Sequence, residues 1–324
     1  MKQLEVTAGK IRSMEIRGAG RIARAAAAEL RDYAKRLKTK DIDDFNKKMN
    51  FAADLLDGTR PTAVSLPNAV RAVMRYKGET VDEARMNIER LADEFITNSE
   101  NAVRKIGEIG AKRVRDGDTI MTHCNSSAAI SIIASAHAQG KHINVIATES
   151  RPRMQGLLTI KQLDNLGIPT SLIVDSAVRY FMKEVDLVVM GSDAVTVNGS
   201  IINKIGTSQL AMAAHEARKN VIIAAETYKF SPRTLLGELV EIEERDSGEV
   251  LSREKLAELP NVSVRNPAFD VTPREYIDLI CTEVGAIPPE MAYIIIKEFL
   301  GWGVEEMNPM GEVGYGVKVL KNAP

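Results

Sequence analysis

Short apolar runs rich in β-branched residues alternate with helical segments from residue 118 onward, and this alternation constrains the fold of the 324-residue chain most strongly. Predicted strands occupy 119–122, 143–148, 170–174, 187–190 and 221–225. Strands separated by helical segments form a mainly parallel sheet that is covered by helices on both faces. The chain is therefore expected to contain a mainly parallel α/β domain over residues 117–324.

The preceding region, residues 1–116, is predicted to be a separate helical domain. Residues 15–37 are rich in alanine, and residues 81–115 carry a run of apolar residues that share one helical face. These are Ile88, Leu91, Phe95, Ala102, Ile106 and Ile109. Between the two helices, Gly58, Pro61 and Pro67 are expected to interrupt helical structure and to form a structured loop that carries Arg60.

The composition excludes several classes of function. Forty-three basic and forty-four acidic residues give a net charge of -1, so no long-range field recruits nucleic acid or a membrane. No apolar stretch approaches the roughly 20 residues that cross a bilayer. The first residues also lack the apolar region of a signal peptide, so a cytoplasmic location is expected.

No cofactor or metal is expected. The four histidines form no HExxH pair, and two cysteines, Cys124 and Cys281, are too few for a disulfide framework or a thiolate metal site. Neither a Walker A sequence nor a dinucleotide-type glycine pattern follows the first strands, so nothing indicates ATP or NAD binding.

The C-terminal part is expected to contain three features. Residues 237–259 are acidic and predict an exposed insertion with a short helix. Residues 261–276 predict a late strand, followed by Thr272 as a helix cap and Pro273 as the first helical residue. Cys281 is predicted to lie on the buried apolar face of a helix at 276–284.

Chemically reactive residues follow the predicted strands directly. Cys124, Glu149, Asp175, Asp193 and Thr227 each come where a strand ends. Ligands of doubly wound sheets bind beyond the carboxyl ends of the strands. We therefore expect these five residues near one edge of the sheet.

Cys124 lies just before a run of small residues, 126–129, that is expected to begin a helix. The positive end of a helix dipole lowers the pKa of a nearby thiol and raises the fraction of thiolate. The alternative is a cysteine that is simply buried, which is the commoner situation for a cysteine considered alone.

Asp193 follows four apolar residues and the Gly191-Ser192 step, so its carboxyl group is expected at the edge of the sheet. Partial desolvation favours a protonated carboxyl group, which is suited to general acid catalysis. An aspartate at a strand end is more often a cap or a turn residue. Asn203 and Lys204 are expected to begin a helix over 204–218, which would make a seat for phosphate.

Other basic residues predict anion binding only as a group. Arg17 lies beside glycines in 17-RGAG-20, Arg60 lies before a proline, and Lys229 follows the strand at 221–225. Each of them alone is more often a solvated side chain. They converge only if the helical region packs over the carboxyl edge of the sheet.

Five segments together resemble the superfamily of initiation factor 2B regulatory subunits and related sugar-phosphate isomerases. They are 17-RGAG-20, 60-RPTAVSLPNAV-70, 122-THCNSSAA-129, 191-GSDAVTVNGSIINKIGT-207 and 225-AETYKF-230. The resemblance covers nearly the whole chain. The RGAG form and the phrase 265-RNPAFDVTPREYIDLICTEVGAIPP-289 look most like the archaeal ribose-1,5-bisphosphate isomerases.

The resemblance implies an N-terminal helical domain, a Rossmann-like α/β domain and oligomers built from dimers, with homohexamers in the bisphosphate enzymes. It also implies Cys124 and Asp193 as the catalytic pair. The substrate contacts that it implies are Arg17, Gly18, Ala19, Gly20, Arg60, Ser126, Ser127, Ala128, Asn203, Lys204 and Lys229. The implied reaction converts ribose 1,5-bisphosphate to ribulose 1,5-bisphosphate, the substrate of Rubisco, in AMP and nucleoside degradation.

Two alternatives remain within this resemblance. The residues Asn125-Ser126-Ser127 look partly like the methylthioribose-1-phosphate isomerases, whose substrate lacks the second phosphate. A regulatory subunit that binds initiation factor 2 is the non-enzymatic alternative. The presence of both Cys124 and Asp193 favours catalysis, since regulatory relatives typically lack one of the pair.

Overall fold

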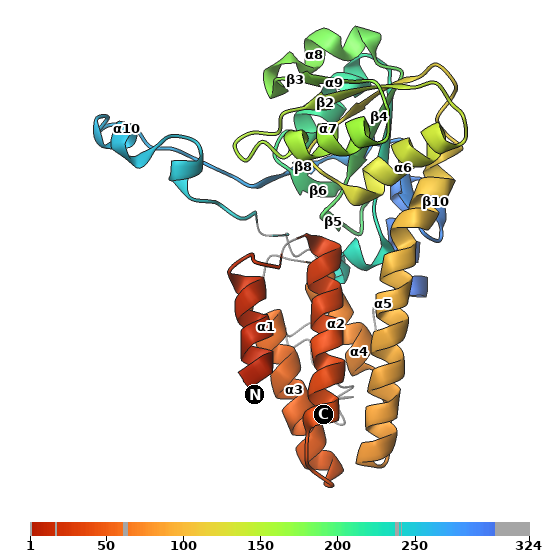
Figure 1. The fold of residues 1–324 in the computed structure, drawn as a ribbon, viewed down its shortest axis with the longest axis vertical. Helices are drawn as coiled ribbons and strands as arrows, with labels where there is room; N and C mark the ends of the chain where they lie inside the picture. Colours follow the sequence, from red (N-terminus) through yellow and green to blue (C-terminus); the bar gives the residue numbers. More distant parts are fainter. Residues whose placement is uncertain (1, 17, 61–63, 237–239, 241, 302–324) are drawn as a thin grey trace, which may run out of the picture. The chain divides into compact units, whose positions relative to one another are not determined.

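The computed structural model describes residues 2–16, 18–60, 64–236, 240 and 242–301. The chain divides into two compact units, which Figure 1 draws as ribbons. The first unit comprises residues 1–101, 231–238 and 295–324, and the second comprises residues 102–230 and 239–294. The domains 1–116 and 117–324 remain a prediction.

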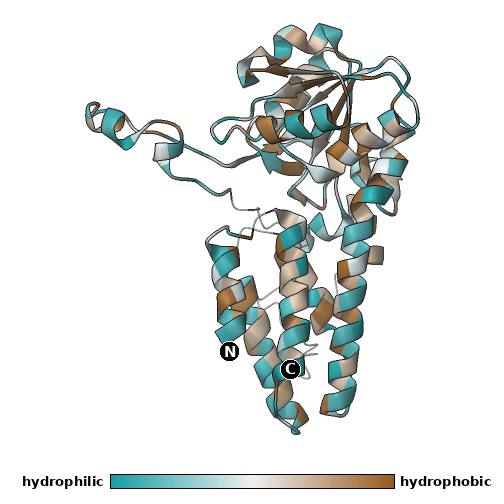
Figure 2. Ribbon diagram, in the orientation of Figure 1, coloured by the Kyte–Doolittle hydropathy of each residue, from teal (hydrophilic) through white to brown (hydrophobic). Residues whose placement is uncertain are grey.

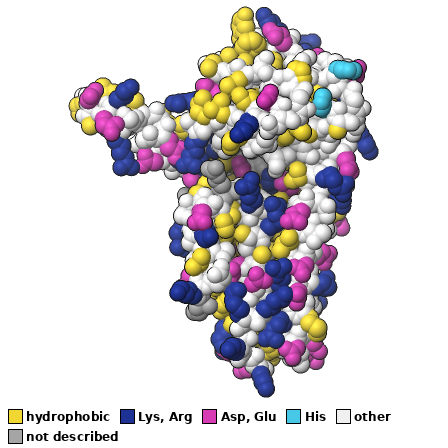
Figure 3. Space-filling view, viewed as in Figure 1, with side chains coloured by type: hydrophobic (Ala, Val, Ile, Leu, Met, Phe, Trp, Pro, Cys, Tyr) yellow, Lys and Arg dark blue, Asp and Glu magenta, His cyan; other side chains and the backbone are white. Residues whose placement is uncertain are grey.

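The first unit is built from helices. They are α1 (Lys2–Arg12), α2 (Ala19–Arg36), α3 (Ile42–Asp57), α4 (Ser65–Met74) and the first part of α5 (Val81–Ala111). Their apolar faces form one core in which Leu30, Phe45 and Ile88 are fully buried. Basic and acidic side chains are interspersed on the face of the molecule in Figure 3.

Helix α4 corrects one expectation, because Pro67 lies inside it instead of interrupting it. Pro67 occupies the first turn, where a backbone N–H has no partner within the helix, so the missing donor costs nothing.

The second unit contains a seven-stranded sheet in the order β10-β9-β7-β4-β1-β2-β3. All five predicted strands are confirmed within two residues at each end. They are β1 (Thr119–Thr122), β2 (Asn144–Thr148), β3 (Thr170–Ile173), β4 (Leu187–Gly191) and β7 (Asn220–Ala224). Every pairing among these strands is parallel, and they are largely hydrophobic in Figure 2. With the helical first unit, this sheet confirms the predicted fold class.

Helices connect the strands of this sheet. They are α6 (Ser127–Ala138), α7 (Gly156–Asn165), the short α8 (Val178–Phe181) and α9 (Thr207–Glu216). Isoleucines and alanines of α6 pack with Ile120 and Val189 in the core of the unit. Among the described residues, no helix is long and apolar enough to cross a membrane.

A second, antiparallel sheet was not predicted from the sequence. It pairs β5 (Ala194–Val195), β6 (Ile201–Lys204) and β8 (Phe269–Thr272) in that order. Strand β8 is the predicted late strand, but a 3-10 turn at Arg274–Tyr276 follows it, with Pro273 as its N-cap. The predicted short helix in the acidic segment is confirmed as α10 (Arg253–Ala257), which lies on an arm that projects from the sheet in Figure 1.

Cys281 lies on a strand and not on a helix, which corrects a second expectation. It belongs to β9 (Leu279–Thr282), which pairs in parallel with β7 and antiparallel with β10 (Gly285–Ile287). A short α11 (Ala292–Ile294) follows. The predicted burial of Cys281 is confirmed, because the residue is fully buried in the core.

Candidate active site

Cys124 and Asp193 follow neighbouring strands of the main sheet. Cys124 comes two residues after β1, and Asp193 comes two residues after β4. These strands pair in parallel, with Ile120 opposite Leu187. Their carboxyl ends therefore lie side by side, where doubly wound sheets bind ligands.

The loop that carries Cys124 leads directly into α6. Cys124 has a φ of 64°, which few residues other than glycine adopt. Ser126 is the N-cap of α6, and its side chain accepts a hydrogen bond from the backbone N–H of Ala129. Ser127 and Ala128 form the first turn. The predicted helix start is confirmed, and the backbone N–H groups of this turn have no partner inside the helix.

The predicted lowering of the Cys124 pKa is wrong. Burial raises the pKa of the Cys124 thiol to about 11. The positive charges of Lys204 and Arg245 pull this pKa down, whereas the negative charge of Asp193 pushes it up. Desolvation is the largest of these effects, since removing water penalises the thiolate directly. The charges of Asp193 and Lys204 therefore both act on the Cys124 thiol.

Asn203 and Lys204 lie at the end of strand β6 and not at the start of a helix, because α9 begins only at Thr207. The Asn203 amide donates to the Thr207 hydroxyl over 2.9 Å. The Lys204 ammonium donates to the Ala268 carbonyl over 3.1 Å. Burial lowers the pKa of Lys204, and the positive charge of Arg245 lowers it further.

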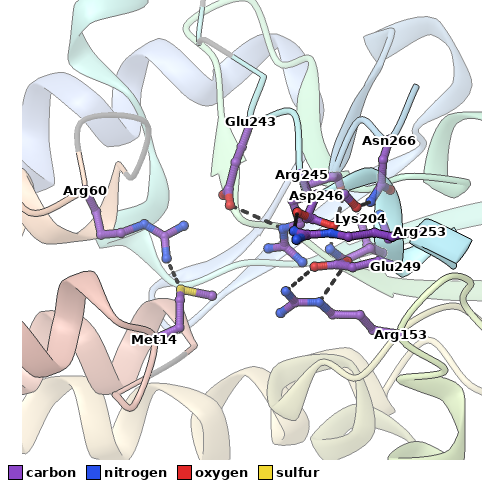
Figure 4. Close-up of polar contacts among 12 residues, drawn as sticks. Met14, Arg60, Arg153, Lys204, Glu243, Arg245, Asp246, Glu249, Arg253 and Asn266 are labelled. Carbon is purple, nitrogen blue, oxygen red and sulfur yellow. Dashed lines mark hydrogen bonds and ion pairs between the residues drawn. The ribbon is translucent and has the colours of Figure 1, made fainter. Parts of the chain in front are cut away.

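Arginines that the sequence did not indicate as site residues lie next to Lys204. The Lys204 ammonium lies 4.6 Å and the Arg245 guanidinium 5.7 Å from the centre of the Phe269 ring. Arg153 forms an ion pair with Glu249, and Figure 4 shows both residues near Lys204 and Arg245. Arg153, Glu249, Lys204 and Arg245 line one cavity together with Arg151. Arg245 escaped notice because it lies in an acidic segment, which is typical of a solvated surface.

Lys229 follows strand β7 and is buried with a carboxylate partner. Its ammonium lies 2.7 Å from a carboxylate oxygen of Glu226. Burial lowers the pKa of Lys229, but the negative charges of Glu226 and Asp193 outweigh it, so the pKa is raised. Lys229 therefore keeps its positive charge and is electrostatically linked to Asp193.

Asp175 also lies at the edge of the sheet, where it organises the loop after β2. Its carboxylate accepts the backbone N–H of Ser150 over 2.8 Å and that of Arg151 over 2.7 Å. Asp175 therefore holds a loop instead of offering a free acid.

The other predicted contacts belong to the first unit. Arg17 lies outside the described residues. Gly18 is the N-cap of α2, at a φ of 91°, and Ala19 and Gly20 begin that helix. The Arg60 guanidinium contacts the Met14 sulfur, as Figure 4 shows. The convergence of these residues on Cys124 remains a prediction.

Within the described part of the chain, no group of three or more His, Cys, Asp or Glu side chains is arranged to hold a metal ion. The chemistry available at this edge of the sheet is that of a thiol, a carboxyl group and several cations. These groups suit proton transfer on an anionic substrate.

Comparison with known proteins places the chain among related sequences and structures. The model of the "Initiation factor 2 subunit family" matches residues 15–289. A protein of Archaeoglobus fulgidus named ribose 1,5-bisphosphate isomerase is 62% identical over 307 residues, which cover 94% of this chain and 96% of that protein. A methylthioribose-1-phosphate isomerase of Acetivibrio thermocellus is 37% identical over 89% of both chains. A crystal structure of a Pyrococcus horikoshii protein titled translation initiation factor eIF-2B superposes with a TM-score of 0.76, at 32% identity over 89% of this chain and 98% of that chain.

Proposed function

We propose, from the premise that this chain belongs to the initiation factor 2 subunit family, that it converts ribose 1,5-bisphosphate to ribulose 1,5-bisphosphate. The chain is an enzyme and an isomerase. Its relatives in Archaeoglobus fulgidus and Methanocaldococcus jannaschii, 62% and 54% identical, bear the name of this activity. The observation that carries the proposal is that Cys124 and Asp193 follow the paired parallel strands β1 and β4, so both lie at one edge of the sheet.

The reaction needs one acid and one base. A phosphate on the anomeric oxygen prevents the ribose ring from opening spontaneously, so the ring oxygen must be protonated while a proton leaves carbon 2. We assign the acid role to Asp193 and the base role to Cys124. The bond between carbon 1 and the ring oxygen breaks, and an enol phosphate forms.

The second half of the reaction returns both protons. The Cys124 thiol gives its proton to carbon 1, and the hydroxyl proton on carbon 2 passes to the Asp193 carboxylate. A carbonyl group is then left on carbon 2. Both side chains recover their starting protonation, so the cycle balances without an oxidant or a reductant.

The protonation of the two groups is linked. The negative charge of Asp193 raises the pKa of Cys124, so a protonated Asp193 makes the thiolate easier to form. Lys204 and Arg245 favour the thiolate as well. The proposed mechanism starts from a Cys124 thiolate and a protonated Asp193, which are the base and the acid that the reaction requires.

Cations at the site suit a substrate with two phosphates. Two phosphate groups together carry a charge of about -3 to -4, since each contributes about -1.5 to -2 near pH 7. Two of the proposed cations, Lys204 and Lys229, lie in the second unit. The N-terminal turn of α6, at Ser126, Ser127 and Ala128, lies in the same unit and would offer backbone N–H groups to a phosphate. Arg17, Gly18, Ala19, Gly20, Arg60 and Asn203 complete the proposed set of substrate contacts.

The wider setting of the reaction is also a proposal. We propose that the reaction belongs to AMP and nucleoside degradation in the cytoplasm and that its product supplies Rubisco. We further propose a homohexamer built from dimers. Sedimentation of the purified protein measures this directly, and a monomer at micromolar concentration would contradict it.

The activity is tested by incubating freshly reduced protein with ribose 1,5-bisphosphate and following phosphorus and carbon NMR spectra. We expect the carbon signals of a ketose to replace those of the anomeric carbon. A parallel incubation with 5-methylthioribose 1-phosphate at the same concentration discriminates the substrates, because a methylthio group favours an apolar pocket and a phosphate favours cations. Absence of turnover with the bisphosphate, or faster turnover of the methylthio compound, would refute the proposed substrate.

A further inference from the structure

Cys124 occupies a backbone conformation that its surroundings must stabilise. A φ of 64° is unfavourable for a residue with a side chain, because the Cβ atom then crowds the backbone. Ser150, in the loop after β2, has a similar φ of 59°. Two such residues in contacting loops indicate that hydrogen bonds hold the conformation in place.

The backbone of Cys124 is tied at both ends. Its N–H donates to the Ser150 hydroxyl oxygen over 2.8 Å. Its carbonyl accepts from the Thr159 hydroxyl over 2.6 Å, and the Thr159 oxygen accepts in turn from the Asn125 amide over 3.0 Å. Neither end of this residue is therefore left to solvent.

The buried ring of His123 fixes the direction of the remaining hydrogen bonds. Its Nε2 lies 2.8 Å from the Ile205 carbonyl oxygen, which can only accept, so Nε2 carries a proton. Burial lowers the pKa of His123 and so favours the neutral ring. In the neutral ring, Nδ1 is an acceptor, and it takes the proton of the Thr148 hydroxyl over 2.6 Å.

The order of donors then extends to Cys124. The Thr148 hydroxyl has used its proton on His123, so toward Ser150 it can only accept, over 3.3 Å. The Ser150 hydroxyl accepts from the Cys124 N–H, and it donates to Thr148, 3.3 Å away, or to the His123 Nδ1, 3.4 Å away. With either acceptor, a directed series of hydrogen bonds links the Cys124 backbone to the carbonyl of Ile205, the residue after Lys204. We name Ser150, Thr148 and His123 the Cys124 tether.

We propose that the Cys124 tether positions the thiol for proton transfer, by holding Cys124 in its left-handed conformation and by joining its loop to the strand end that carries Lys204. These three are positioning residues, since they act through Cys124 and Lys204. Gly206 fits this arrangement, because a Cβ atom at that position would lie 3.0 Å from the His123 ring. The inference rests on the proposed function of Cys124.

Thr148→Val tests the tether because it removes the central hydroxyl and keeps the shape of the side chain. Thr148→Ser restores the hydroxyl. Thr272→Val is the matched control, because Thr272 is fully buried and its hydroxyl has no hydrogen-bond partner among the described residues. Ser150→Ala removes the direct acceptor of the Cys124 N–H and provides a second test if Thr148→Val does not fold.

Two measurements apply to each variant: kcat and KM with ribose 1,5-bisphosphate, and the pH midpoint of Cys124 alkylation by iodoacetamide, followed by mass spectrometry. We expect Thr148→Val and Ser150→Ala to lower kcat about 10- to 100-fold, with KM within about 3-fold of wild type. Their alkylation midpoint should fall from its high value toward about 8.5, because a released thiol regains water. Thr148→Ser and Thr272→Val should retain both values of the wild type.

Unchanged kcat and midpoint in Thr148→Val and Ser150→Ala would overturn the inference. A lower kcat with an unchanged midpoint would also overturn it, because the thiol would then not have moved. The alkylation needs no substrate, so the tether is still tested if the wild-type protein fails to convert ribose 1,5-bisphosphate. That failure would count against the proposed function alone.

Discussion

Gly191 lies directly against Ser126, so that a Cβ atom at position 191 would come within 2.2 Å of the Ser126 Oγ. Gly191 ends strand β4 and precedes the Asp193 segment, whereas Ser126 caps the helix that follows Cys124. This close approach brings the two segments that carry the proposed catalytic pair together. It requires a residue without a side chain at position 191.

Gly191→Ala should therefore reduce both stability and activity. The added methyl group pushes the Ser126 cap away, which costs about 1–3 kcal/mol of unfolding free energy. Chemical denaturation measures this loss. Gly9→Ala is the control, because Gly9 lies in helix α1 with open space around it, so alanine should leave the protein as stable or more so. Equal effects of the two substitutions would contradict the packing argument.

Cys124→Ser and Asp193→Asn should each lower kcat with ribose 1,5-bisphosphate by several orders of magnitude while the fold persists. Each substitution removes one of the two proton-transferring groups, and such groups typically contribute about 10²- to 10⁴-fold each. Cys281→Ala should retain the wild-type rate, since Cys281 lies in the core of the sheet. Circular dichroism checks the fold of each variant. Near-normal turnover would remove the affected residue from the mechanism.

Substitutions around Cys124 should shift its alkylation midpoint in opposite directions. The thiol pKa of about 11 is raised first by burial, lowered by Lys204 and Arg245, and raised by Asp193. Lys204→Met and Arg245→Met each remove a positive charge and should move the midpoint upward. Asp193→Asn removes a negative charge and should move it downward. Shifts of the same sign in all three variants would show that these charges do not act on the thiol.

Asp57, the last residue of α3, should make the protein less stable as pH rises. Burial raises the pKa of Asp57 to about 7 against an ordinary value of 3.8, and one of its buried carboxylate oxygens has no hydrogen-bond partner among the described residues. Arg233 lowers this pKa and Asp54 raises it. Between pH 4 and 7 the folded state binds more protons than the unfolded state, so the free energy of unfolding falls as pH increases and then levels off.

Asp57→Asn removes this titration. The variant should be more stable than the wild type by on the order of 2 kcal/mol at pH 8, with a smaller difference at pH 4. Urea denaturation at the two pH values measures both. Asp54→Asn, one turn earlier on the same helix, removes a negative charge that raises the Asp57 pKa and should therefore move the loss of stability to lower pH. A wild-type advantage that grows between pH 4 and 8 would contradict the assignment.

The main sheet could be predicted because its strands are short, buried and rich in β-branched residues. The small sheet was missed because β5 and β6 flank the turn at Asn198-Gly199, and turn residues there also fit the start of a helix. Cys281 was assigned to a helix because the spacing of Ile277, Ile280 and Val284 fits a helical face. Short apolar segments satisfy both periods, and only the pairing of β9 with β7 decides between them.

The proposed site was predictable in its position but not in its electrostatics. Strand ends identify where Cys124 and Asp193 lie, since the carboxyl ends of parallel strands share one edge. The high pKa of Cys124 follows from burial, which local sequence does not show. His123 was unrecognisable as a positioning residue, because its partners Thr148 and Ile205 lie 25 and 82 residues away in the sequence.

The most direct test of the central claim is a crystal structure of the Cys124→Ser variant soaked with ribose 1,5-bisphosphate. We predict that the side chains at positions 124 and 193 flank one ribose, with position 124 next to carbon 2 and the Asp193 carboxyl group at the ring oxygen. Both phosphates should contact cationic side chains or backbone N–H groups, with Lys204 among them. A sugar that contacts only one of these two positions, or neither, would contradict the account.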